Sequence, residues 1–258
     1  MEPNGHVQQS NEGMTTYLDF ETHCTCSYDH LPFDFLTIDD CPLHARLLAP
    51  LLEDKPAIVG PVMCEDGKAR PPWAATDPLT RLYYDTTWGV PGLSENEMFR
   101  ALCFQVLQSG LSMRAVLRKF PALNRAFSDF DPYVVAQMTE TDVEKMLDNP
   151  ALIRNRTKLS AVITNAEATV AMRRDGTCLP ELVWAYQPAI MPQPETMLDI
   201  PERTEESAAL ARDLKARGFT FIGPKSAWLF MQAAGVVNTH LQGSWRRDAG
   251  LRMTPLEF

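Results

Sequence analysis

The sequence lacks any apolar run near the roughly 20 residues that a helix needs to cross a bilayer. Its first residues also lack the basic and apolar pattern of a secretory signal peptide. We therefore expect a protein without membrane contact, located in the cytoplasm and nucleoid-associated if bacterial. In such a compartment the six cysteines are expected to be reduced thiols.

Positive charge is scarce as well, with 24 basic against 33 acidic residues and a net charge of −9. This deficit argues at first against a nucleic-acid partner. The imbalance is local, however, because residues 1–70 hold 12 acidic and 4 basic residues. An acidic extension over 1–70 thus precedes a near-neutral body over 71–258, on which a basic face remains possible.

The acidic extension carries few structural signals. Residues 1–16 are polar without periodicity, which predicts disorder, a short apolar helix is expected at 43–52, and residues 56–72 have the composition of a linker. Four side chains of the types that zinc prefers also fall in the extension: Cys24, Cys26, Cys41 and His44. A Cys-x-Cys pair is unusual zinc spacing, so incidental thiols in a flexible arm are the alternative.

From Pro71 onward the apolar pattern is almost entirely helical, which predicts an all-α bundle with short connections. Capping residues place the helix ends. The predicted helices run from Ser94 to Gly110, from Ser112 to near Pro121, from Asp131, from Thr139, over 151–174, from Thr204 to Gly218, and up to Gly235. Only residues 218–223 have an extended pattern.

Two of these helices meet at a tight turn at 148–151. The first amides of a helix have no intrahelical partner and bind phosphate well. Arg154, Arg156 and Lys158 follow the turn closely. A nucleic-acid contact and an ordinary solvated helix face are both consistent with this pattern.

Several motifs occur together in the body: "DPL", "Y-x-D-x-x-WGVP", "Q-x-GLS" and "IRNR-x-K", in this order. As a set they are specific, and residues 73–245 resemble the bacterial 3-methyladenine DNA glycosylase I family of helix-hairpin-helix base-excision enzymes. The resemblance implies a helix-hairpin-helix glycosylase-like bundle that acts as a monomer on double-stranded DNA containing alkylated bases. Such enzymes extrude the damaged base into a pocket that stacks against its ring and reads its edges.

The resemblance also implies which residues face the base and the DNA. The base pocket would contain Trp73, Tyr83 and Trp88, with Thr80 and Met113 at positions where the family has a tyrosine and a tryptophan. Core packing is the alternative for Trp73, Tyr83 and Trp88, and for Trp88 above all. The DNA backbone would contact the hairpin and its flank: Asn149, Ala151, Arg154, Arg156 and Lys158.

Gln105 lies at the rim of the apolar stripe of its predicted helix, where an amide is either filler or a group that reaches into a pocket. By resemblance its position belongs to a glutamate that contacts the excised base. Glutamine keeps an acceptor oxygen but loses the charge that favours a cationic ring. We therefore interpret Gln105 as the catalytic position of an altered pocket.

The family also joins its chain ends through zinc, bound by two cysteines and two histidines. The matching positions are Pro71, Tyr84, His240 and Ser244, of which only His240 can ligate. We therefore expect no zinc or other cofactor in the body, with Pro71, Tyr84 and Trp245 packing in place of the metal.

Two functions follow from these observations. The first is a monofunctional glycosylase that excises an alkylated purine of the 3-methyladenine type and leaves an abasic site. The second is a catalytically weakened or inactive homologue that binds DNA or its lesions. The retained DNA-facing motifs favour engagement of DNA, and the altered pocket favours a loss of the chemistry.

Overall fold

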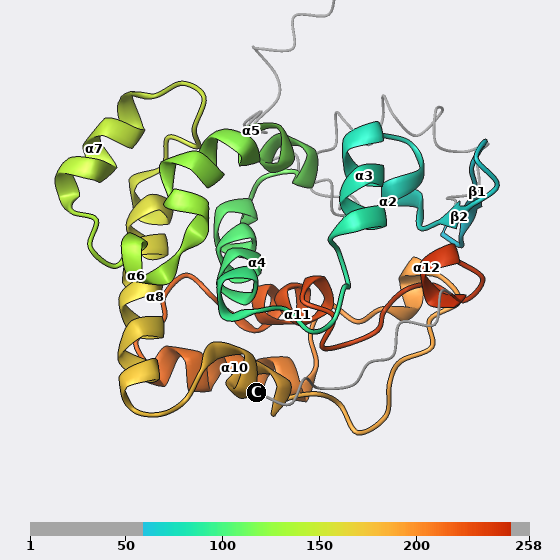
Figure 1. Ribbon diagram of the computed structural model, residues 1–258. Coiled ribbons are helices and arrows are strands. Elements are labelled where there is room, and N and C mark those ends of the chain that lie inside the picture. The colour runs from blue at the N-terminus through green and yellow to red at the C-terminus, as the bar shows by residue number, and fades with distance from the viewer. Residues whose placement is uncertain (1–58, 249–258) are drawn as a thin grey trace, which may run out of the picture. The chain divides into compact units, whose positions relative to one another are not determined.

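The computed structural model describes residues 59–248 (Figure 1). The expected disordered opening, the helix at 43–52 and the Cys24, Cys26, Cys41 and His44 set lie outside the described residues. All described residues belong to one unit, Pro56–Phe258. Among residues 59–248, no helix is long and apolar enough to cross a membrane.

The described part is built from helices, so the all-α prediction is confirmed. Two 3-10 turns, Ser128–Phe130 and Met197–Asp199, connect neighbouring helices. The α-helices are α2 (Pro72–Ala75), α3 (Pro78–Thr86), α4 (Glu95–Gln108), α5 (Met113–Ala126), α6 (Pro132–Val135), α7 (Glu140–Asp148), α8 (Arg156–Arg174), α9 (Leu179–Trp184), α10 (Glu205–Ala216), α11 (Pro224–Ala233) and α12 (Trp245–Asp248).

The predicted helix starts are confirmed where a side chain caps the backbone. Ser94 and Glu97 form the capping box of α4, in which the Glu97 carboxylate accepts the Ser94 amide at 2.8 Å. Asp131 caps α6, and the Thr139 amide donates to Asp142 at 3.0 Å ahead of α7. Such caps are local interactions, which explains why the sequence pattern locates them well.

Helix α5 corrects the expectation that it ends near Pro121, because it continues through the proline to Ala126. A proline inside a helix removes one backbone hydrogen bond. Residues beyond it nevertheless pack fully into the core, with Leu123 and Phe127 at 0% exposure. The burial of these two side chains offsets the lost hydrogen bond, so the helix continues past Pro121.

The long helix also starts later than expected, at Arg156 rather than at 151. Asn155 is its cap, accepting the Lys158 amide at 3.1 Å. Leu152 and Ile153 are buried and anchor the preceding segment as a loop. The connection between α7 and α8 is therefore the longer loop 149–155, which opens with a tight turn close to the predicted one, in which the Leu152 amide donates to the Asn149 carbonyl at 3.1 Å.

Residues 218–223 form no strand, which corrects another expectation. Phe221 has a φ of 59°, a conformation that breaks an extended chain. The side chain of Asn165 in α8 holds this loop. It accepts a hydrogen bond from the Thr220 amide at 2.7 Å and donates one to the Thr220 carbonyl at 3.2 Å.

The strands lie instead in the expected linker, as the antiparallel pair β1 (Val62–Met63) and β2 (Ala69–Arg70). Arg70 is 1% exposed, because it is held by carboxylates of the hairpin and of α3. The linker prediction is therefore wrong for these residues. The domain boundary after residue 70 stays a prediction.

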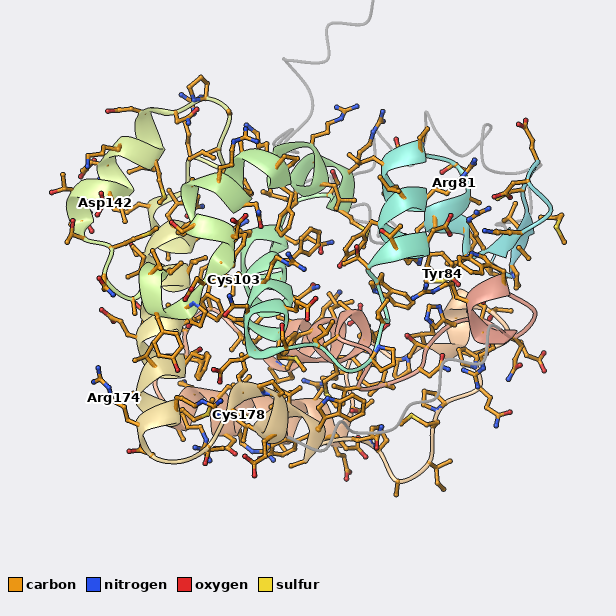
Figure 2. The ribbon with its side chains drawn as sticks, viewed as in Figure 1. Arg81, Tyr84, Cys103, Asp142, Arg174 and Cys178 are labelled. Carbon is orange, nitrogen blue, oxygen red and sulfur yellow. The ribbon has the colours of Figure 1, made fainter. Side chains whose placement is uncertain are left out.

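Helix α4 packs against α5, α8, α9 and α11, and Figure 1 shows it between α5, α8 and α11. Its residues 102–107 are all buried, including Cys103, which Figure 2 shows on the α4 ribbon. This makes α4 a central helix of the core and places its polar residues, Gln105 among them, beside neighbouring helices.

Candidate functional site

A small pocket lies where α3, α4, α5 and α11 meet. Its enclosed volume is only about 40 Å³, well below the roughly 300–1,000 Å³ usual for ligand sites. Its lining is Tyr83, Thr87, Leu93, Glu97, Arg100, Ala101, Phe104, Phe120 and Ala233.

Three aromatic rings form the apolar wall of this pocket. Tyr83 stacks on Phe104 with ring centroids 5.2 Å apart and an interplanar angle of 20°. Phe120 meets the edge of Phe104 at 5.3 Å. Burial raises the pKa of the Tyr83 hydroxyl, so it stays protonated at neutral pH. The wall of this pocket is therefore aromatic and uncharged.

Of the residues predicted to face the base, Tyr83 is the one that lines this pocket. Gln105 is 5% exposed, more buried than a rim position, and its side chain makes no hydrogen bond within the described residues. Its neighbour Phe104 lines the pocket instead. Gln105 thus lies next to the pocket wall, and its side-chain amide has no hydrogen-bond partner within the described residues.

Thr80 and Met113 occupy other surroundings. The Thr80 hydroxyl donates to the Trp73 carbonyl at 2.8 Å, which ties α3 to α2. Met113 is partly buried and packs against the core at the start of α5. Neither residue lines the pocket in this structure.

Trp73 and Trp88 belong to a second cluster, which they form with Tyr84 and Ala233. Trp73 meets Tyr84 and Trp88 edge-on, with centroid distances of 5.4 Å to each. Trp88 is 8% exposed. The core-packing interpretation of Trp88 therefore describes its contacts, and this cluster packs around α3.

Three of the four positions that match the family's metal ligands lie together in this structure. The His240 ring nitrogen Nδ1 is 3.0 Å from the Tyr84 hydroxyl, and that hydroxyl donates to Ser244 at 3.2 Å. Ser244 in turn donates to the Leu241 carbonyl at 2.7 Å. A phenol and an alcohol are not the ligands that zinc prefers, and these residues do not fit a zinc site. Among residues 59–248, no group of three or more His, Cys, Asp or Glu side chains is placed to hold a metal.

Asp85, one residue after Tyr84, connects the two ends of the body. It accepts two hydrogen bonds from Arg70 of β2, at 2.9 and 2.7 Å, and one from the Trp245 indole of α12 at 3.0 Å. Partial burial would raise the pKa of Asp85, but the bonds from Arg70 and Trp245 hold it below its usual value. Figure 2 shows neighbouring Tyr84 on α3, beside α12. Ion pairs and hydrogen bonds thus join this region, and Trp245 also packs against the cluster that contains Tyr84, as expected.

The loop between α7 and α8 holds the residues predicted to contact DNA. The Asn149 side chain accepts the Ala151 amide at 2.9 Å, so both groups are used in shaping the loop. Lys119 of α5 donates to the carbonyls of Pro150 and Leu152 at 2.8 and 3.0 Å. Sequence reasoning missed Lys119, because its partners are distant in the chain.

The three basic residues after the loop differ in their surroundings. Arg154 is exposed, and Arg156 pairs with Glu140 and Glu144 of α7. Lys158 is 5% exposed, and its ammonium donates to the carbonyls of Leu107 and Ser109 at 2.7 and 2.5 Å, at the end of α4. The expectation that Lys158 contacts a DNA backbone is therefore corrected, because its charge is buried on these carbonyls.

Comparison with known proteins agrees with this geometry. The family model for methyladenine glycosylase matches residues 73–247. DNA-3-methyladenine glycosylase 1 of Escherichia coli is 40% identical over 174 residues, covering 66% of this chain and 92% of that protein. A crystal structure of 3-methyladenine DNA glycosylase I has 39% identity and a TM-score of 0.66, covering 68% of this chain and 98% of that chain. A phenylalanine-for-tyrosine variant of 3-methyladenine DNA glycosylase I has been solved in complex with 3-methyladenine. It has 30% identity to this chain and a TM-score of 0.62, and the match covers 65% of this chain and 91% of that chain.

The fold and the site thus define a helical DNA-repair glycosylase architecture. The chain belongs to the methyladenine glycosylase family.

Proposed function

We propose that this protein is a monofunctional DNA glycosylase that flips an alkylated purine of the 3-methyladenine type out of the duplex and hydrolyses its N-glycosyl bond. The observation that carries the proposal is the match of residues 73–247 to the methyladenine glycosylase family, and the packed rings of Tyr83, Phe104 and Phe120 support it. Aromatic faces hold an extruded base by stacking, and they attract a ring that alkylation has made cationic.

The loop 149–155 supports the DNA contact. Its exposed Arg154 and the first amides of α8 are available to phosphate, since no hydrogen bond from the Arg156 or Thr157 amide is found within the described residues. We propose that Asn149 and Ala151 shape this loop, and that Arg154, with Arg156, supplies the positive charge. The partner would be double-stranded DNA containing alkylated bases, bound by a monomer in the cytoplasm.

A second candidate is a DNA- or lesion-binding homologue with weakened catalysis. The observation that favours it is Gln105, whose neutral amide stands where the resemblance implies a carboxylate. A cationic base already has a weak glycosidic bond, so the loss of one carboxylate need not abolish its release.

Release of free base from methylated duplex DNA separates the two candidates. The glycosylase proposal expects free 3-methyladenine and alkali-labile abasic sites, formed with multiple turnover. Binding of an abasic-site duplex without any base release would instead establish the binding homologue.

A further inference from the structure

Lys158 carries a buried charge to which the proposed DNA contact gives no role. The residue is 5% exposed, and its ammonium donates to the carbonyls of Leu107 and Ser109 at 2.7 and 2.5 Å. These two carbonyls belong to the last turn and the C-cap of α4. The bonds therefore join the first turn of α8 to the end of the helix that carries Gln105.

The backbone of Lys158 is held from the other side. Its amide donates at 3.1 Å to the side chain of Asn155, which is the N-cap of α8 and the last residue of the loop 149–155. Lys158 is thus bonded through its amide to the loop that we propose to contact DNA, and through its ammonium to α4. A displacement of either segment relative to the other would break one of these bonds.

The end of α4 does not need this charge as a cap. Gly110 follows the C-cap with a φ of 69°, the left-handed conformation that commonly ends a helix, and the Leu111 amide donates to the Gln108 carbonyl at 2.7 Å. An ammonium is favourable at the negative end of a helix. Burying it costs free energy, however, because no carboxylate among the described residues pairs with it, and this burial lowers the pKa of Lys158 to about 8. The link between α4 and α8, rather than the cap, accounts for a lysine here.

We propose that Lys158 is a positioning residue for base release, which fixes the loop 149–155 in one placement relative to the end of α4, where Gln105 lies. The inference rests on the proposed glycosylase function. In that function the loop holds the DNA backbone while α4 faces the extruded base, so the reaction needs the two segments in a fixed relation. A misplacement of about 1 Å, caused by a substitution far from the reacting atoms, can lower a rate about 100-fold.

This role separates two measurable quantities. DNA affinity depends on phosphate contacts, which Arg154 and the first amides of α8 would supply with or without the ammonium of Lys158. The rate of base release from fully bound DNA depends instead on how the loop and α4 are placed relative to each other. Loss of the ammonium should therefore lower the rate at saturation and leave the affinity nearly unchanged.

Both quantities are measured on the full chain. Single-turnover release of 3-methyladenine from methylated duplex DNA, at saturating protein, gives the rate, and fluorescence anisotropy with an abasic-site duplex gives the Kd. Lys158→Met keeps the length of the side chain and removes its ammonium. We expect it to lower the saturated rate about ten-fold or more, while the Kd stays within about three-fold of wild type. Lys158→Arg, which keeps a charged donor, should restore most of the lost rate.

Two further variants make the test sharper. Lys215→Met makes the same chemical change at an exposed position of α10, and it should leave the rate and the Kd unchanged. Lys158→Gln can still donate to one carbonyl, so its rate should lie between those of Lys158→Met and wild type. It also takes the place of Lys158→Met if that variant does not fold, as circular dichroism melting curves will show.

An unchanged saturated rate in folded Lys158→Met would overturn the inference and leave the proposed function intact. A loss of affinity as large as the loss of rate would also overturn it, because Lys158 would then serve DNA binding alone. The same holds if Lys158→Arg is as slow as Lys158→Met. If wild type binds the abasic-site duplex and releases no base, the proposed function fails, and the inference with it.

Discussion

Tyr84 and His240 lie 156 residues apart in the sequence, and a hydrogen bond of 3.0 Å joins them in the interior. The direction of this bond follows from its neighbours. Ser244 donates its proton to the Leu241 carbonyl and therefore accepts from Tyr84. Tyr84 has then used its proton, so His240 must donate from Nδ1, and its Nε2 is unprotonated.

The surroundings of His240 keep the ring neutral. Its Nε2 is buried without a hydrogen-bond partner within the described residues. A Cβ at Gly89, which has a φ of +71°, would lie 2.6 Å from this nitrogen. Burial, with the charge of Arg246 as a second cause, lowers the pKa of His240 to about 3.

This pKa predicts a pH dependence of stability. Between the usual pKa of 6.5 and about 3, the unfolded chain binds a proton that the folded chain excludes. The free energy of unfolding should therefore fall as the pH drops through this window, by up to about 1.4 kcal/mol per pH unit. Urea unfolding from pH 7 to 4 measures it. His240→Asn should show a shallower decline than wild type, and parallel curves would contradict the assignment.

The hydrogen-bonded junction predicts a body without zinc. Elemental analysis is made on the full chain and on a variant that removes every candidate ligand of the extension: Cys24→Ser, Cys26→Ser, Cys41→Ser and His44→Asn. We expect no bound zinc in the variant, with a melting temperature unchanged by chelator. One tightly held zinc per variant chain would contradict this. Zinc in the wild type alone would assign it to the extension.

Asp85 is predicted to be a main electrostatic support of the body. Asp85→Asn would weaken two charged hydrogen bonds to Arg70, which is 1% exposed. Bonds of this kind are worth about 1.5–3 kcal/mol, so the free energy of unfolding should fall by about 2–3 kcal/mol. Asp66→Asn is the matched control, because Asp66 binds the same arginine from an exposed position and should cost less. If urea denaturation shows the same loss of unfolding free energy for both variants, Asp85 is not the stronger support of the two.

Gln105→Glu tests whether the amide limits the chemistry on a cationic base. A carboxylate beside the pocket should raise 3-methyladenine release about ten-fold, less than the roughly 100-fold or more attributed to a single well-placed catalytic donor. Adding Met113→Trp should increase the gain if this side chain reaches the base. Asn96→Asp makes the same chemical change at an exposed position of α4 and should have no effect. A loss of activity in Gln105→Glu would show that the amide reads a neutral edge.

Arg154→Ala should weaken binding to duplex DNA of any sequence and reduce the salt slope by about 1, because one phosphate contact is lost. Arg154 is the better residue to replace first, because Arg156 also forms ion pairs that hold α7 to α8, and its loss could change the fold. Arg174→Ala removes an exposed charge at the other end of α8, as Figure 2 shows, and serves as the control. Fluorescence anisotropy between 50 and 200 mM salt measures both. The double variant, Arg154→Ala with Arg156→Ala, is measured in the same way. If neither the single nor the double variant binds DNA more weakly than wild type, this loop does not contact the DNA.

Local chemistry in the sequence determined where most helices begin. Ser94 with Glu97 and Thr139 with Asp142 place α4 and α7, because a cap joins residues only three positions apart. The motif set likewise identified the family before any contact was known. Pro121 shows the limit of such reasoning, since its local effect was outweighed by the burial of Leu123 and Phe127.

Only the tertiary structure decided what surrounds each functional position. Phe104 and Phe120 come from different helices, and Trp245 is 160 residues from Asp85. Lys158 belongs to the basic motif in sequence, yet it is buried against the end of α4. These pairings depend on how helices pack, and packing is set by the shape and burial of many side chains at once rather than by neighbours along the chain.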